Sequence, residues 1–186
     1  MKEKRIARIE VRSDNSKEMV LTGRPVVFNQ PTVIGEDYKE VIAEGALDGA
    51  DLSDVRLLYN HDLSTVPLAR TPKTMELSVD PAGLTFTANL PANEYGRTVY
   101  EAVKRGDLTG MSFSFKVPDG GDSYDPETNT RTIRKIEKIY ECSIVPFPAY
   151  PTASVEARDA IKASRNRWQL KQKAKILYNQ IMKVRV

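Results

Sequence analysis

The sequence predicts an α+β protein that is rich in β-strands, with the strands forming a closed or nearly closed barrel to which helices are attached. Three observations lead to this prediction. Short β-prone runs recur between turn-forming residues over residues 1–155. One segment among them has helical periodicity instead. From about Ser154 onward the pattern is helical and basic. We therefore expect a body over residues 1–155 and a helical tail over residues 156–186.

The first half of the body supplies five expected strands, which cover residues 5–11, 19–28, 55–59, 74–79 and 84–90. Pro25 interrupts the second of them and indicates a sheet edge or a bulge. The last two flank Asp80-Pro81-Ala82-Gly83. In this segment proline sets φ and glycine closes the turn, so we expect a hairpin.

The helix of the body is expected between Asn93 and Gly106. Tyr95, Val99 and Val103 recur at helical spacing and mark one apolar face. Asn93 is a favourable N-cap residue, and Gly106 can adopt the left-handed conformation that often ends a helix.

The second half of the body begins with a strand over residues 110–115. A polar loop is expected over residues 118–129, because its composition is that of a surface excursion. Two more strands follow, over residues 130–136 and 139–145. The sheet region then ends at three prolines, which are Pro146, Pro148 and Pro151.

Composition excludes several classes of function. The charged N-terminus is not followed by the apolar stretch of a signal peptide, and no apolar run approaches the ~20 residues that span a bilayer. One histidine and one cysteine are too few for a typical zinc site, and a single cysteine forms no internal disulfide. Because the glycine-rich phosphate-binding motifs are missing as well, we expect no metal, no cofactor and no membrane association.

Charge is divided unevenly along the chain. The net charge is +3, but residues 156–186 contain nine basic and two acidic residues, so the tail carries +7 and the rest −4. Trp168 lies among the basic residues, which would suit nucleic-acid binding. We instead interpret the tail as an arm that docks on a protein partner, because basic tails commonly serve as interaction arms.

Ser112 is the first candidate for chemistry. In the strand 110–115, Met111, Phe113 and Phe115 alternate with Ser112 and Ser114, so the two hydroxyls share the face opposite to the apolar side chains. An open face of this kind leaves room for a substrate carbonyl. The alternative is that the serines are simply the polar face of an amphipathic strand.

His61 is the natural general base, because the imidazole group has an unperturbed pKa of ~6.5 and can activate a serine. It follows an apolar strand, at a rim where sites are often built, although it could be an ordinary surface histidine.

Glu141, at the start of an apolar strand, can orient the imidazole or be a plain strand-end charge. Asp62 is a rival candidate for the acid that orients His61. It is the weaker one, because it is adjacent to His61 and neighbouring residues on an extended chain point to opposite faces. Cys142 is a weaker candidate nucleophile and more typical of a buried small apolar residue.

An ordered set of motifs runs along roughly residues 20–155. These motifs are Tyr59-Asn60-His61-Asp62, Leu68-Ala69-Arg70-Thr71, Arg105-Gly106-Asp107-Leu108-Thr109-Gly110, Gly110-Met111-Ser112-Phe113-Ser114-Phe115, Tyr140-Glu141-Cys142-Ser143-Ile144-Val145 and Pro148-Ala149-Tyr150-Pro151. In this order they resemble one known family, the prohead proteases of tailed phages.

This resemblance implies a fold like that of herpesvirus assemblin, a β-barrel surrounded by helices. It implies a serine endopeptidase in which Ser112 is the nucleophile, His61 the base and Glu141 the third member, with no cofactor. The implied substrates are the scaffolding segment of the major capsid protein and the protease itself, inside the assembling procapsid in the host cytoplasm. Self-association into a homodimer or higher homo-oligomer stays open.

A catalytically silent scaffold or assembly chaperone is the competing interpretation. Loss of any one of Ser112, His61 and Glu141 would favour it, and all three are present.

Overall fold

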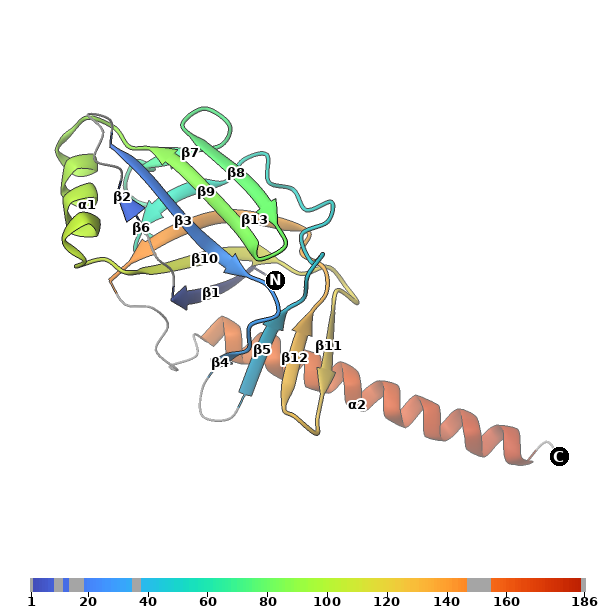
Figure 1. The fold of residues 1–186 in the computed structure, drawn as a ribbon. Helices are drawn as coiled ribbons and strands as arrows, with labels where there is room; N and C mark the ends of the chain where they lie inside the picture. Colours follow the sequence, from blue (N-terminus) through green and yellow to red (C-terminus); the bar gives the residue numbers. More distant parts are fainter. Residues whose placement is uncertain (1, 9–11, 14–18, 35–37, 147–154, 185–186) are drawn as a thin grey trace.

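The computed structural model describes residues 2–8, 12–13, 19–34, 38–146 and 155–184, and side chains within 19–34, 38–146 and 162–180. Its strands form three separate sheets and its helices lie outside them (Figure 1). The α+β, strand-rich prediction is therefore confirmed. The expectations for residues 9–11 and for Pro148, Pro151 and Ser154 fall outside the described residues.

The largest sheet has five strands, in the order β1 (Lys2–Arg8), β10 (Gly110–Lys116), β13 (Lys138–Val145), β6 (Arg56–Tyr59) and β7 (Ala69–Arg70). β10 pairs antiparallel with β1 and with β13, whereas β13 pairs parallel with β6. The strand with the candidate nucleophile is therefore an inner strand, held by hydrogen bonds on both sides.

The second sheet has four strands, in the order β2 (Arg12–Ser13), β3 (Val20–Val27), β9 (Gly83–Asn89) and β8 (Met75–Asp80). β8 and β9 form the expected hairpin, in which Asp80 pairs with Gly83 and its carboxylate accepts hydrogen bonds from the N–H groups of Ala82 and Gly83. The register of β3 shifts between Gly23 and Val26, which confirms the irregularity expected at Pro25.

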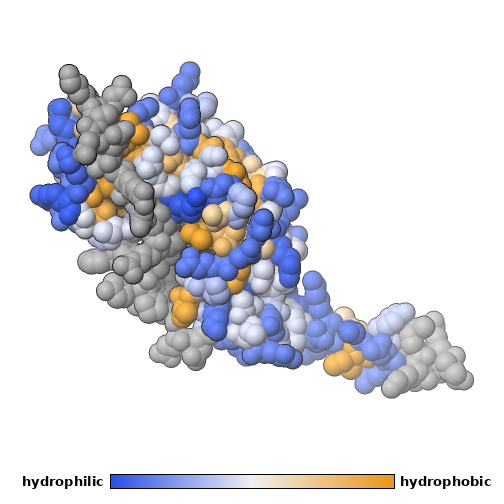
Figure 2. All heavy atoms as spheres, viewed as in Figure 1, coloured by the Kyte–Doolittle hydropathy of each residue, from blue (hydrophilic) through white to orange (hydrophobic). Residues whose placement is uncertain are grey.

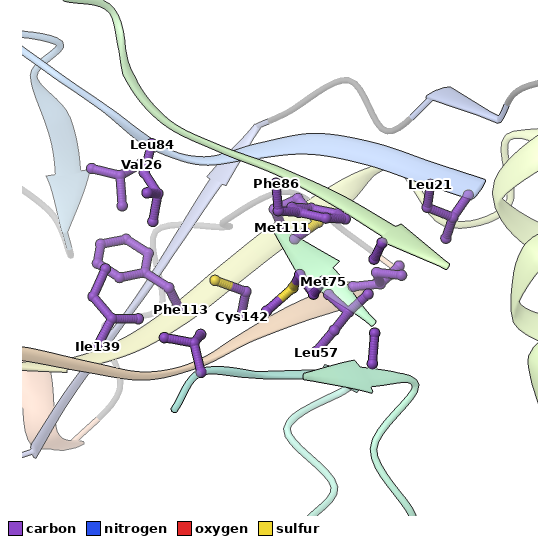
Figure 3. Close-up of a cluster of buried hydrophobic side chains, with 14 of the residues drawn as sticks. Leu21, Val26, Leu57, Met75, Leu84, Phe86, Met111, Phe113, Ile139 and Cys142 are labelled. Atoms are coloured by element: carbon purple, nitrogen blue, oxygen red, sulfur yellow. The ribbon is translucent and has the colours of Figure 1, made fainter. Parts of the chain in front are cut away.

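The core lies between these two sheets. Met111, Phe113 and Cys142 from the first sheet cluster with Leu21 and Phe86 from the second, and all are buried (Figure 3). These are the alternate positions of β10 and β13, so the other positions of both strands must lie on the opposite face.

Helix α1 (Glu94–Arg105) has the expected caps. The side chain of Asn93 accepts a hydrogen bond from the N–H of Gly96, and Gly106 takes a left-handed conformation with φ 85°. Val99 and Val103 of the predicted stripe are buried against the core. The helix thus leads the chain directly into β10.

The third sheet is the main departure from the expected topology. Its order is β11 (Asp122–Asp125), β12 (Thr130–Ile133), β5 (Tyr38–Ile42) and β4 (Thr32–Ile34). β11 lies within the segment that composition predicts as a loop, and β5 pairs parallel with β12 from a distant part of the chain.

Of the closed or nearly closed barrel that the sequence predicts, the closed form is not found in the part of the chain that the structure describes. Closure needs a hydrogen-bond ladder that runs continuously around the barrel. Here the ladders stop at strand edges, such as those of β7 and β4, and the strands divide into three sheets. An assemblin-like barrel is therefore not found.

A buried ion network ties the third sheet to the C-terminal helix. Arg131 donates to Glu40 at 2.9 Å and to Asp122 at 2.7 Å, and these three side chains are almost fully buried. Arg167 donates to both carboxylate oxygens of Asp122. Although burial raises the pKa of Asp122, the charges of Arg131 and Arg167 hold it below its ordinary value.

Helix α2 (Val155–Val184) packs against β1 and β11 near its beginning and then projects from the body (Figure 1). Ser164 is buried, whereas residues 169–180 are all exposed. Figure 2 shows the projecting part as mainly hydrophilic with an apolar patch. Among the described residues, no helix is long and apolar enough to cross a membrane.

Candidate active site

The chain turns sharply at the end of β6, and this turn presents His61. Asn60 and His61 have φ values of 52° and 60°, and the N–H of Asp62 donates to the carbonyl of Tyr59 at 3.0 Å. Two successive left-handed residues are the mark of a type I′ turn. Because Asn60 also donates to the carbonyl of Ile144, the turn is fixed to β13.

Glu141 meets the imidazole ring of His61. Nδ1 of His61 lies 2.8 Å from Oε1 of Glu141, and the two side chains are 16% and 4% exposed. In the tautomer that has its proton on Nδ1, the ring donates to this carboxylate oxygen and Nε2 is the basic nitrogen. The structure therefore brings together these two predicted site residues.

Ser143 contacts both members of this pair. Its hydroxyl donates to Oε2 of Glu141 at 2.5 Å and accepts from the backbone N–H of His61 at 3.2 Å. Sequence reasoning missed Ser143. The signal that could have found it is alternation, because Ser143 shares a strand face with Glu141, two residues away.

Ser112 lies on the neighbouring strand and on the same face of the sheet. It is directly opposite Ser143 in the β10–β13 ladder, and Ser114 is opposite Glu141. Side chains that are directly opposed in an antiparallel ladder lie on one face, ~5 Å apart at Cβ. The ladder thus brings Ser112 beside the group that holds His61.

The expectation that these serines occupy an open face is wrong. Ser112 and Ser114 are both 0% exposed. Within the part of the chain that the structure describes, the hydroxyl of Ser114 has no hydrogen-bond partner, whereas Ser112 does interact with another group.

Asp62 is not the partner of His61. Its carboxylate accepts hydrogen bonds from the hydroxyl and the N–H of Ser64, which lower its pKa. The sequence argument against Asp62 assumed an extended chain, but this segment is a turn. The carboxylate of Asp62 is turned away from His61 by its hydrogen bonds to Ser64 in the following loop, and strand alternation plays no part.

Cys142 points into the core rather than toward the site. It is 0% exposed, and burial raises the pKa of its thiol well above the ordinary value, with the charge of Glu141 acting in the same direction. A thiol that stays protonated is a poor nucleophile.

Within the described residues, no group of three or more His, Cys, Asp or Glu side chains could hold a metal ion.

The arrangement as a whole supplies a carboxylate, an imidazole and a serine hydroxyl on one sheet face. This combination is suited to acyl transfer, in which the imidazole accepts the serine proton.

Comparison with protein families agrees with this chemistry. A family model described as caudovirus prohead serine protease matches residues 7–167. The chain belongs to this family. No curated protein and no solved structure matches the chain.

The protein is therefore a serine protease of phage capsid maturation, which acts inside the procapsid and interacts with capsid proteins. The family match of this prohead protease extends beyond residue 155 into α2 and ends at Arg167, the residue that binds Asp122. The rest of α2 lies outside the match.

The buried position of Cys142 gives a first prediction. The folded protease should resist a thiol-specific reagent such as DTNB and keep its activity after treatment, because neither exposure nor ionisation favours reaction. In denaturant, one thiol per chain should react. Rapid labelling of the folded protein with loss of activity would instead make Cys142 a rival nucleophile.

Proposed function

We propose that this protease cleaves peptide bonds with Ser112 as the nucleophile, His61 as the general base and Glu141 as the acid that orients His61. The observation that carries the proposal is the contact between His61 and Glu141 on the sheet face that also bears Ser112. A histidine held by a carboxylate at one ring nitrogen presents the other nitrogen as a base.

The reaction would run in two steps. His61 Nε2 takes the proton of Ser112 as its hydroxyl oxygen attacks the peptide carbonyl, and the imidazolium then gives that proton to the leaving amine, so the C–N bond breaks and an acyl-serine forms. A water molecule, deprotonated by His61, attacks the ester. The acid product leaves and Ser112 regains its proton.

Glu141 would stabilise the imidazolium in both steps. Its carboxylate is nearly buried, where little water competes for the charge, so the attraction to the imidazolium is stronger than at an exposed site.

Access to Ser112 needs an opening step. A peptide carbonyl must approach the hydroxyl to within about 3–3.5 Å, which a fully buried side chain does not allow. We infer that the covered serine represents a resting state and that substrate binding exposes it.

As substrates we propose the scaffolding segment of the major capsid protein and the protease chain itself. The support is membership of the prohead protease family. Enclosure of enzyme and substrate in one shell, formed in the host cytoplasm, would raise their effective concentration, so weak affinity would suffice.

We also propose that the projecting part of α2 is an arm that docks on an acidic partner, the scaffolding segment. Residues 170–186, which follow the part that packs on the body, contain five basic and no acidic residues. A second copy of the helix would be repelled by like charge, whereas an acidic segment would be attracted. Leu170 and Leu177, both more than half exposed, lie seven residues apart and add an apolar contact on one helix face.

The nucleophile and the base give the second prediction. In co-expression with the capsid protein, Ser112→Ala and His61→Ala should each reduce precursor cleavage by roughly 10³-fold or more, and the double variant should be no worse, because the two residues act as a unit. Ser114→Ala is the matched control and should keep most activity. Normal cleavage by Ser112→Ala would overturn the assignment.

The orienting acid gives the third prediction. Glu141→Gln should fold but lose roughly 10²-fold or more in kcat, less than Ser112→Ala, because the imidazole loses its anionic partner. Asp62→Asn should stay active, since Asp62 bonds to Ser64 instead. The reverse pattern, an active Glu141→Gln and an inactive Asp62→Asn, would show that Asp62 is the orienting acid and that the assignment of Glu141 is wrong.

The arm gives the fourth prediction. Truncation after Gln169 keeps Arg167 and its contact with Asp122 but removes the projecting helix. The truncated protease should cleave the capsid precursor in solution at the normal rate, yet be packaged poorly into assembling shells. Quantitative gels of purified shells measure packaging. Normal packaging would exclude the arm as a docking element.

A further inference from the structure

Ser143 is the residue near the site to which the proposed chemistry gives no task. It is fully buried, and its single hydroxyl joins two separate parts of the His61–Glu141 pair. The contacts form a closed circuit, from the ring of His61 to Glu141, from Glu141 to Ser143, and from Ser143 back to the backbone of His61.

The hydrogen-bonding capacity of a serine hydroxyl suits this circuit. A hydroxyl has one proton to donate and lone pairs that accept. Ser143 gives its proton to Glu141, which can only accept, and receives the N–H of His61, which can only donate. The two partners therefore determine the direction of both hydrogen bonds that the Ser143 hydroxyl makes.

The carboxylate of Glu141 needs such a restraint. Rotation about its last side-chain bond is only weakly restricted by intrinsic preference. A hydrogen bond at Oε1 alone would allow the group to swing, whereas bonds at both oxygens fix its plane. The bond to the N–H of His61 also holds the left-handed backbone from which the imidazole projects.

Ser114 shows that a buried serine on this face does not by itself explain these contacts. It faces Glu141 across the ladder and is also 0% exposed, but its hydroxyl has no hydrogen-bond partner among the described residues. The two serines therefore have similar surroundings and differ in whether their hydroxyls reach the pair.

We propose that Ser143 is a positioning residue of the protease, which fixes the carboxylate of Glu141 and the backbone of His61 so that the imidazole is held in a reactive orientation. This inference rests on the proposed roles of His61 and Glu141. Ser143 acts through those two residues rather than on the substrate.

The test compares Ser143→Ala with its matched control, Ser114→Ala, on a peptide substrate. Ser143→Ala should lower kcat by about 10–100-fold, as removal of a supporting hydrogen bond commonly does, with KM unchanged. Ser114→Ala should keep kcat. Ser143→Cys, whose thiol is a weaker donor of similar size, should fold and recover part of the loss.

A spectroscopic measurement separates positioning from simple loss of stability. Because the chain has one histidine, its ring N–H signals in NMR need no assignment among several residues. The Nδ1–H signal that reports the bond to Glu141 should be sharp in the wild type and in Ser114→Ala, and broadened or lost in Ser143→Ala while the backbone spectrum stays folded.

The double variant Glu141→Gln/Ser143→Ala distinguishes failure of this inference from failure of the proposed function. It should be no slower than Glu141→Gln alone if Ser143 works through Glu141. An impaired Glu141→Gln beside a normal Ser143→Ala would overturn the role of Ser143 alone. A normal Glu141→Gln would overturn the proposed function itself. Multiplying losses, or a loss in KM only, would also contradict positioning.

Discussion

The antiparallel ladder between β10 and β13 is the constraint on which both the core and the site depend. Its alternation places Met111 and Cys142 in the core and Ser112 and Ser143 on the opposite face. The ladder therefore fixes polar site groups with the rigidity of the apolar packing behind them. A shift of one residue in either strand would exchange the two faces and destroy the site and the core together.

The elements that could be predicted from the sequence are those with local signals. The helix after Asn93 has its caps and stripe within one segment, and the hairpin at Asp80 has its turn chemistry between adjacent strands. The pairing of β5 with β12 could not be predicted, because its parallel partners, such as Lys39 and Thr130, are far apart in the chain and no local pattern records their contact. The closed barrel was not confirmed, since strand number alone does not determine closure.

The candidate site was predicted in part because residue chemistry limits the choices. A single histidine makes His61 the natural base, and Glu141 is the acid that the fold brings to it. The burial of Ser112 could not be foreseen, because strand alternation shows which face its side chain is on and not whether that face is covered. Ser143 was missed because serine is common on polar strand faces, and only the folded structure shows that its hydroxyl reaches two partners.

The left-handed conformation of His61 has a consequence for how this chain can vary. The second central position of a type I′ turn favours glycine, and a left-handed residue with a side chain costs roughly 1–2 kcal/mol. Replacement by glycine would therefore relax the turn while removing the only imidazole of the chain. With His61 in the proposed role of general base, stability and catalysis would place opposite demands on this position. A homologue with glycine after Asn60 would then have a more relaxed turn and no imidazole to activate a serine.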